Sequence, residues 1–569
     1  MKYAKLADTY EDLEEHSSTL KKTEILATFL ENLEQEGKNE IVYLLQGRAF
    51  PDYIKKDLGI SENIMQKVLK KATGATDKEI TNEWKEKGDL GLVAEKLVKN
   101  KSQRTLSEKE LTAEKELKNI QKLPELEGKG TVDQKIGIVA ELITAASPLE
   151  ARYIVRTVLH DLRIGVGPGT LRDAIVKACF KNEKDEDKKK NKKLVQEAYD
   201  KTADFAEVFR KASKSKKALK MTKLKPGKPV KVMLFQKAES VKEGFETVGK
   251  PCLLDYKYDG FRILINKDKE GKVKVFTRRL EEVTKQFPEI EEYVQEYVDG
   301  DNFILDAEAV GYDPQKKEYK AFQEISQRIK RKYDIEEMRE KLPVEVNVFD
   351  ILYYNGKSKL NVSFKKRRVL IEKIVNNKKW KIRTAKAITT SDLKEAKEFY
   401  DQALKEGEEG IMMKNLEAEY KPGSRVGYGI KIKPSENELD LVITGADYGT
   451  GKRAGWLTSY YVSCRDPQKD ELQEVGKVST GLKEKESEGL SYKEMTKKMK
   501  ELEKETKGRH MEVEPRVIVE VTYQNVQKSP KYSSGYALRF PRFSRLRPDK
   551  AIDEIATIGE IEKAKEKSR

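Results

Sequence analysis

The sequence predicts a multidomain chain with an all-α N-terminal part, an α+β middle part and an all-β C-terminal part. Residues 1–215 repeat apolar side chains at three- and four-residue spacing, the pattern of amphipathic helices. Residues 216–434 alternate strands rich in Val, Ile and Tyr with helical patterns, and residues 435–569 hold short strands between turn signals. These changes of pattern set the expected domain boundaries.

Charge favours a polyanionic partner. The 569 residues include 114 Lys+Arg and 98 Asp+Glu, for a formal net charge of +16. This excess favours nucleic acid first and a membrane surface second; a Lys/Glu-rich surface of a heat-adapted protein is the alternative. No apolar run approaches the roughly 20 residues that span a bilayer, and the N-terminus does not resemble a signal peptide. We therefore expect a cytoplasmic protein without a membrane partner.

The cysteines indicate a reducing compartment. Cys179, Cys252 and Cys464 lie far apart and form no Cys-x-x-Cys pair, which also argues against structural zinc.

Helical periodicity organises the N-terminal part. The expected helical segments are Leu20–Leu33, Ile60–Leu69, Val93–Val98, Ile136–Ile143 and Ile154–Leu162. The run Lys181–Lys193 contains no apolar residue and predicts a solvated loop or mobile insertion.

A glycine-rich loop lies between two of the helical patterns. It reads Arg163-Ile164-Gly165-Val166-Gly167-Pro168-Gly169-Thr170, and Thr170 with Asp173 predicts a capped helix start. Glycines before a helix start suit backbone contact to phosphate. An ordinary helix-helix turn is the alternative on these residues alone.

The middle part is organised around Asp255-Tyr256-Lys257-Tyr258-Asp259-Gly260-Phe261-Arg262. Flanking apolar runs predict a hairpin: a strand, a tight turn at Asp259-Gly260 and a returning strand. Asp255 and Lys257 then share one strand face. A lysine becomes a nucleophile only where its surroundings favour loss of its proton. An ordinary surface hairpin is the alternative.

Charged strands follow downstream in a fixed order. Asp306 and Glu308 share one face of an apolar strand, where carboxylates are costly unless they bind something. The other elements are Phe276–Glu281 with Arg278, Val348–Leu352 with Phe349, Glu408–Lys414, Tyr420–Arg425 and Ile430–Pro434, whose Lys431 and Lys433 share one face.

This ordered series resembles the covalent nucleotidyltransferases, the superfamily of ATP-dependent DNA ligases, RNA ligases and mRNA capping enzymes. The matching elements are Lys-x-Asp-Gly-x-Arg, an arginine strand, Asp-x-Glu, Phe-Asp, Glu-Gly-x-x-x-Lys and Lys-x-Lys. Two positions depart from the family pattern: Asp255 stands where cellular DNA ligases usually have Glu, and Gly429 replaces an aromatic residue.

The resemblance implies the site and its cofactors, ATP and Mg²⁺. Lys257 would be the catalytic residue, which attacks the α-phosphate and carries AMP. Glu308 and Glu409 would serve ribose contact and Mg²⁺ placement. The implied nucleotide-binding residues are Asp255 for the base, Phe349 for adenine stacking, and the cations Arg262, Arg278, Arg425, Lys431 and Lys433.

The resemblance also covers the flanking parts. It implies an all-α DNA-binding domain over 1–215, an α+β adenylation (nucleotidyltransferase) domain over 216–434 and an all-β OB-fold domain over 435–569. The glycine-rich loop is similar to a minor-groove-contacting turn, and the basic-aromatic run 538–550 is similar to the family's final motif. The implied DNA-binding residues are Arg163, Gly165, Gly167, Arg542 and Arg545.

The expected protein is an ATP-dependent DNA ligase of the archaeal and eukaryotic replicative type. Its partner would be nicked duplex DNA, and we expect a monomer that is nucleoid-associated in an archaeon. Gln103 and Leu106 have the spacing of a peptide that docks on a sliding clamp, with a solvated loop as the alternative. An RNA ligase or capping-type nucleotidyltransferase, and a non-catalytic clamp on DNA, are the competing functions.

Overall fold

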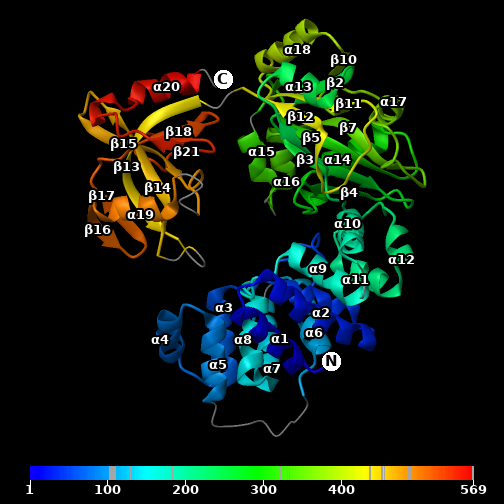
Figure 1. Cartoon of the computed structure of the whole chain (residues 1–569), viewed down its shortest axis with the longest axis vertical. Coiled ribbons are helices and arrows are strands. Elements are labelled where there is room, and N and C mark those ends of the chain that lie inside the picture. Colours follow the sequence, from blue (N-terminus) through cyan, green and yellow to red (C-terminus); the bar gives the residue numbers. More distant parts are fainter. Residues whose placement is uncertain are drawn as a thin grey trace. The chain divides into compact units, whose positions relative to one another are not determined.

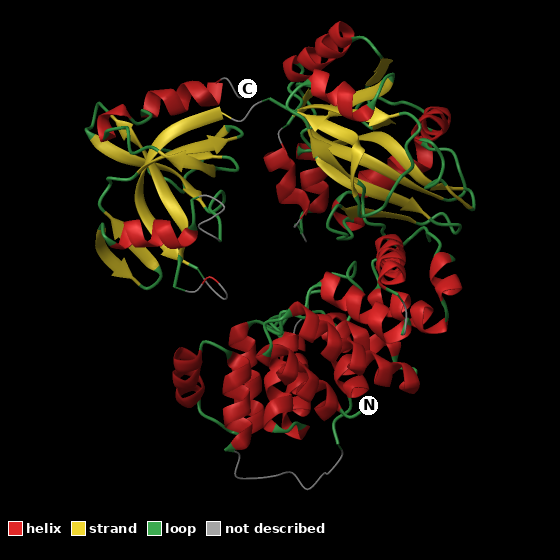
Figure 2. Ribbon diagram, in the orientation of Figure 1, coloured by secondary structure: helices red, strands yellow, loops and turns green. Residues whose placement is uncertain are grey.

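A computed structural model gives the fold (Figure 1), in which two compact units, Met1–Ile432 and Lys433–Arg569, are each described by themselves. The structure describes all residues except 101–109, 129, 182–183, 321, 330, 332, 435–436, 450–452, 454, 485–489 and 567–569. The clamp-docking prediction for Gln103 and Leu106 therefore lies outside the described residues. Figure 2 shows helices in the N-terminal part, and strands together with further helices in the rest of the chain.

The N-terminal part is helical, as predicted. Its helices are α1 (Tyr3–Glu15), α2 (Thr19–Glu36), α3 (Glu62–Thr73), α4 (Asp77–Lys87), α5 (Leu90–Lys99), α6 (Ala113–Lys122), α7 (Thr131–Ala145), α8 (Pro148–Val158), α9 (Pro168–Cys179), α10 (Asp185–Thr202), α11 (Phe205–Lys214) and α12 (Lys216–Lys220). The five expected segments are confirmed, although α3 begins at Glu62 and not at Ile60, and α8 ends at Val158 and not at Leu162. Their apolar stripes meet in one buried core.

Two local predictions in this part are wrong. Helix α9 begins at Pro168 with Gly167 as its N-cap, and not at Thr170, because proline is well suited to the first helical position. The run Lys181–Lys193 is not a loop throughout, because α10 begins at Asp185. Val195 and Tyr199 are buried farther along α10 and anchor this helix on the core.

The middle part contains two sheets. One has the order β1 (Leu234–Lys237), β12 (Arg425–Ile432), β11 (Gly410–Asn415), β2 (Cys252–Lys257) and β10 (Ala387–Thr390). The other has the order β4 (Val273–Thr277), β3 (Phe261–Lys267), β5 (Phe303–Asp313), β7 (Val344–Tyr354) and β8 (Lys357–Ser358), with β6 (Glu318–Tyr319) beside β5 and β9 (Ile382–Thr384) beside β7.

Each sheet buries an apolar face beneath helices. Helices α13 (Val241–Val248) and α18 (Leu393–Lys405) cover the β1-to-β10 sheet, where Leu254, Ile411 and Ile430 are buried. Helices α14 (Pro288–Tyr297), α15 (Phe322–Ile329), α16 (Ile335–Lys341) and α17 (Phe364–Ile374) are the others of this part. The opposite faces carry the charged residues, because side chains alternate along a strand.

The hairpin predicted around Lys257 is wrong. Strand β2 pairs with β10 and β11, whereas β3 pairs with β4 and β5 in the other sheet. The Asp259-Gly260 turn therefore passes the chain from one sheet to the next. A Cβ on Gly260 would meet the backbone oxygen of Ala309 on β5, so glycine allows this close approach.

The second unit is β-rich. Its elements are β13 (Asn437–Tyr448), β14 (Leu457–Asp466), β15 (Glu471–Val478), α19 (Tyr492–Lys500), β16 (Glu503–Lys507), β17 (His510–Val513), β18 (Ile518–Tyr523), β19 (Val526–Lys528), β20 (Tyr536–Leu538), β21 (Arg542–Leu546) and α20 (Ile558–Glu566). The long strand β13 organises them, pairing with β14 on one side and with β17 and β18 on the other. Most of their buried apolar side chains share one core, and Val442, Ile518 and Ile555 form a smaller cluster.

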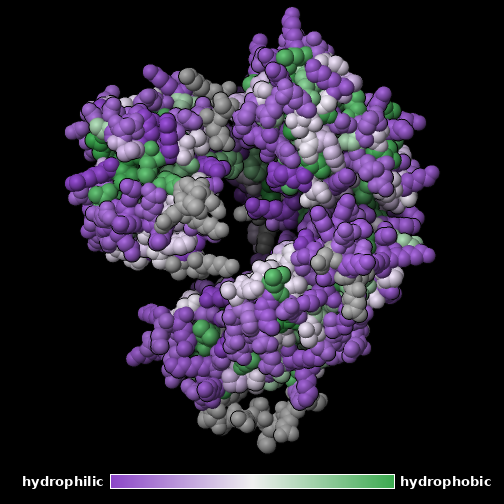
Figure 3. Space-filling view, in the orientation of Figure 1, coloured by the Kyte–Doolittle hydropathy of each residue, from purple (hydrophilic) through white to green (hydrophobic). Residues whose placement is uncertain are grey.

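The molecular surface is strongly polar. Hydrophilic residues cover most of the face in Figure 3, in keeping with a sequence of which 37% is charged. Within the described residues, no helix combines the length and the apolar character needed to cross a membrane.

Candidate active site

Lys257 is the last residue of β2, on the charged face of its sheet. Asp255 pairs in register with Met412 of β11, and Met412 pairs with Lys431 of β12. Directly paired residues point to the same face of a sheet. Asp255, Lys257 and Lys431 therefore share one face, as the sequence predicted for Asp255 and Lys257.

Two glutamates interact with the Lys257 side chain, Glu409 through direct contact and Glu308 through its charge. The Lys257 ammonium forms an ion pair with Glu409, whose backbone N–H donates to the Lys257 carbonyl at 2.9 Å. Glu308 lies on β5 opposite Arg262 of β3. Burial raises the pKa of the Glu308 carboxyl to about 8, an effect that Lys257 and Arg262 oppose and Glu409 reinforces.

Arg262 is held from several directions by buried groups. Its Nε and Nη2 atoms donate to the two oxygens of Asp306 at 2.8 and 2.6 Å, and Nη1 donates to the Met233 carbonyl at 2.7 Å. Tyr420 donates its hydroxyl to Asp306 at 2.7 Å. Asp306 is thus the partner of Arg262 and Tyr420, which explains its place on an otherwise apolar strand.

Phe349 lies where β5 and β7 lose regular register. The pairing shifts between Asp306↔Asp350 and Ala307↔Val348, so Phe349 is the extra residue of a bulge. Its ring centroid lies 5.3 Å from Cζ of Arg262 and 4.7 Å from Nζ of Lys414. A cation from each of the two sheets therefore lies against this ring.

Asp255 has one satisfied and one unsatisfied oxygen. Its side chain is buried, and Lys414 of the neighbouring strand donates to Oδ2 at 2.5 Å. Within the described part of the chain, Oδ1 has no hydrogen-bond partner. Burial raises the pKa of this carboxyl, while Lys414 and Arg368 oppose the rise.

The remaining predicted cations lie at separate points around these strands. Arg278 stays exposed to solvent, although partial desolvation of its guanidinium and the neighbouring cations Arg262 and Arg425 lower its pKa. Arg425 donates to the Phe235 carbonyl at 3.2 Å. Strand β12 includes Lys431 but ends at Ile432, so Lys433 lies beyond the predicted strand face, at the start of the second unit.

Gly429 has a structural explanation. A Cβ at this position would lie 2.5 Å from an atom of the Phe235 ring. Phe235, from β1, therefore occupies the space beside Gly429, and the aromatic side chain comes from another strand.

Three family models match the chain. The model described as "DNA ligase N terminus" matches residues 2–176, "ATP dependent DNA ligase domain" matches 232–433, and "ATP dependent DNA ligase C terminal region" matches 453–550. The DNA ligase of Nanoarchaeum equitans is 42% identical over 572 residues, covering 100% of this chain and 99% of the relative. The chain belongs to the ATP-dependent DNA ligase family.

Further comparisons agree with this membership. The DNA ligase of Thermococcus fumicolans is 40% identical over 562 residues, covering 99% of this ligase and 98% of the relative. The solved structure "Pmar-Lig_PreS3" covers 95% of the ligase and 99% of that chain at a TM-score of 0.55 and 17% identity, a likeness of fold alone. The family resemblance is confirmed, and the activity is ATP-dependent sealing of nicks in DNA.

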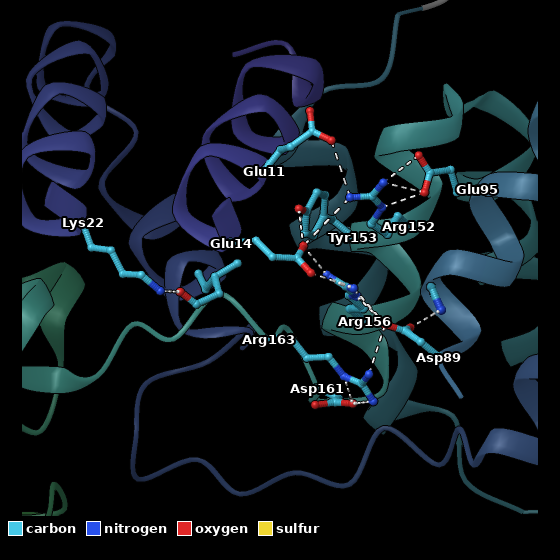
Figure 4. Close-up of polar contacts among 12 residues, drawn as sticks. Glu11, Glu14, Lys22, Asp89, Glu95, Arg152, Tyr153, Arg156, Asp161 and Arg163 are labelled. Atoms are coloured by element: carbon cyan, nitrogen blue, oxygen red, sulfur yellow. Dashed lines mark hydrogen bonds and ion pairs between the residues drawn. The ribbon is translucent and has the colours of Figure 1, made fainter. Parts of the chain in front are cut away.

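The ligase holds the predicted DNA-contacting loop between α8 and α9 (Figure 4). Arg163 forms ion pairs with Asp161 at 2.6 Å and with Asp89 at 3.2 Å. Gly165 is exposed at a φ of +65°, a conformation that favours glycine. In the second unit, Arg545 donates to Glu520 at 2.7 Å, while Arg542 is exposed on the same strand, β21.

Sequence reasoning missed three residues of the ligase's candidate site. Tyr420 fixes Asp306, and Lys414 fixes Asp255. Glu408 is buried, accepts the Asp259 N–H at 3.3 Å, and has a pKa raised by burial to about 8. All three lie in the quoted motifs, but only the tertiary partners reveal their roles.

Proposed function

We propose that the ligase seals nicks through an AMP group carried on Nζ of Lys257. In the first step Nζ attacks the α-phosphorus of ATP, a P–N bond forms, and the bond to pyrophosphate breaks. AMP then passes to the 5′-phosphate at the nick, and the 3′-hydroxyl displaces it as the phosphodiester forms. The observation that carries this proposal is the ion pair of Lys257 with Glu409, close enough to Glu308 for the charge of Lys257 to act on that carboxyl.

The ion pair with Glu409 has a direct chemical consequence. An ammonium has no lone pair, so Nζ must lose a proton before it attacks. The Glu409 carboxylate contacts Nζ and is the nearest group that can receive that proton. Glu409 also orients Nζ, because its backbone is hydrogen-bonded to Lys257 itself.

Glu308 and Glu409 are the proposed ligands of Mg²⁺. Mg²⁺ favours oxygen donors and is held by one or two carboxylates together with substrate phosphates. Burial, reinforced by the charge of Glu409, raises the pKa of Glu308, and a bound cation would favour its ionised form. Bound Mg²⁺ would offset phosphate charge.

The nucleotide would be held by groups from both sheets. Phe349 would stack on adenine, held in place by Arg262 and Lys414. The unsatisfied Oδ1 of Asp255 would accept a hydrogen bond from the base. Arg278, Arg425 and Lys431 would supply positive charge to the phosphates, because phosphoryl transfer depends chiefly on positioning and charge stabilisation. A phosphate contact by Lys433 stays a prediction.

DNA would contact the helical N-terminal part and the C-terminal part of the chain. Arg163, Gly165 and Gly167 would serve the helical part, and Arg542 and Arg545 the C-terminal part, which we assign to the OB-fold class. The divisions at 215/216 and 434/435, a monomeric state, a cytoplasmic nucleoid location and clamp docking stay predictions.

A nick-sealing assay tests the proposal. Purified protein with ATP, Mg²⁺ and a duplex carrying one 5′-phosphorylated nick should convert the nick to intact strand and become labelled by α-³²P-ATP. Labelling by GTP in preference to ATP would favour a capping-type enzyme, and sealing of RNA ends alone would favour an RNA ligase. DNA binding without any labelling would indicate a non-catalytic clamp.

A further inference from the structure

Lys22 is a buried lysine whose ammonium forms a hydrogen bond inside the helical part. It lies on α2, and only 8% of its surface is exposed. Its ammonium donates to the Ile164 carbonyl, 142 residues away, at 2.5 Å. Figure 4 shows Lys22 reaching toward the loop that carries Arg163. Burying an ammonium is costly, so this contact calls for an explanation beyond packing.

The contact fixes the direction of one peptide plane. The Ile164–Gly165 bond is trans, and in a trans peptide the C=O and the following N–H point in opposite directions. Because the Ile164 oxygen points inward to Lys22, the Gly165 N–H points away from Lys22. Gly165 is exposed, and within the described residues its amide donates no backbone hydrogen bond.

The sequence at Gly165 fits this arrangement. A Cβ there would lie 2.6 Å from the Lys22 ammonium, so glycine leaves room for the lysine as well as allowing the φ of +65°. Two residues later, α9 begins at an N-cap, Gly167, that gives no side-chain cap. The outward amide therefore adjoins a helix start whose first N–H groups attract anions.

We propose that Lys22 is a positioning residue for DNA binding, which aims the Gly165 N–H at a phosphate of the DNA backbone. This inference rests on the proposed function of the loop. Lys22 itself does not touch DNA, because its ammonium is enclosed and bound to Ile164. The other end of the loop is held by the ion pair of Arg163 with Asp89, which Arg156 in turn holds at 2.8 Å.

The test is the salt dependence of DNA binding by Lys22→Met. Affinity for a fluorescent nicked duplex is measured by anisotropy at several KCl concentrations. Loss of one hydrogen bond to a phosphate predicts about 10-fold weaker binding. The slope of log K against log salt should stay unchanged, since a direct phosphate contact would lower it by about 1. The KM for nicked DNA should rise while kcat at saturating DNA stays near that of the unaltered protein.

Two further variants make the result decisive. Lys21→Met removes the same charge from the neighbouring position, whose side chain is 50% exposed, and should bind within about 2-fold of the unaltered protein. Lys22→Gln keeps an N–H donor and should bind with intermediate affinity, and it replaces the methionine variant if that protein does not fold.

Three outcomes would overturn the proposal: unchanged affinity in Lys22→Met, a slope lowered by about 1, or equal weakening in Lys21→Met. Labelling of Lys257 by ATP without DNA reports on the nucleotide pocket alone. Failure of that labelling in the unaltered protein would reject the proposed function and leave the binding comparison interpretable.

Discussion

Lys257 and Glu409 are joined twice, through an ion pair of their side chains and through a 2.9 Å hydrogen bond from the Glu409 N–H to the Lys257 carbonyl. The end of β2 and the start of β11 are thus linked at the proposed nucleotide site. Its chemistry can be tested on the lysine, on the glutamates and on the strand neighbours.

Lys257→Arg should abolish the covalent adenylate. A guanidinium keeps its proton at accessible pH and cannot attack phosphorus, while it can still pair with Glu409. Retained radiolabel from α-³²P-ATP would contradict the assignment of Lys257. The same variant should seal a nick whose 5′-phosphate is already adenylated, which serves as the control for folding and DNA binding.

Asp255→Asn should narrow the preference for ATP over GTP. The amide can keep its oxygen toward Lys414, but its NH₂ group would face the adenine amino group donor to donor. A hydrogen bond to a charged group contributes about 1.5–3 kcal/mol, so the ratio of initial labelling rates should fall roughly 10-fold or more. An unchanged ratio would place base selection elsewhere, and Asp255→Ala should weaken ATP labelling as well.

Labelling of Lys257 should depend on pH through Glu308. The raised pKa of about 8 means that this carboxyl holds its proton below that pH and ionises above it. At low Mg²⁺ the labelling rate should therefore rise toward pH 8, and added Mg²⁺ should move the midpoint to lower pH, because metal binding releases protons. Glu308→Gln should remove this Mg²⁺-dependent movement. If the pH midpoint of the labelling rate does not change with Mg²⁺ concentration, Glu308 is not a Mg²⁺ ligand.

Glu408→Gln should stabilise the protein at alkaline pH. The folded pKa of Glu408 is raised from 4.5 to about 8, so its favourable contribution is complete below pH 4.5 and is lost as pH rises through 8. Glutamine keeps an oxygen for the Asp259 N–H and stays neutral. The free energy of unfolding at pH 9 should rise by about 1–3 kcal/mol and change little at pH 5. Denaturant melts at both pH values measure this, and equal effects would contradict it.

Arg542 and Arg545 should differ in their contribution to DNA binding. They lie on one strand, but Arg545 already pairs with Glu520, while Arg542 is exposed without an ion pair among the described residues. Arg542→Gln should lower the salt slope of binding by about 1, and Arg545→Gln should lower it less. Equal slopes for both variants would show that the Glu520 pair does not compete with DNA.

The sequence predicted the elements and the order of the charged motifs. The helices α2, α3, α5 and α7 and the strands β5 and β7 follow from periodicity, which is a local property of the chain. The shared face of Asp255 and Lys257 also follows from the two-residue period of a strand. The identity of the family required only these motifs in order.

Contacts between distant residues were decided by the tertiary structure. The partner of Asp255 is 159 residues away in Lys414, and that of Lys22 is 142 residues away in Ile164. Periodicity tells which face a side chain occupies but not which strand or loop comes to lie beside it. For the same reason the hairpin predicted at the Asp259-Gly260 turn was wrong. Local sequence indicates the turn, but the pairing of β2 and β3 with distant strands places them in different sheets. The sequence by itself determined the chemistry available to this protein, and the packing of its sheets and helices decided which groups meet.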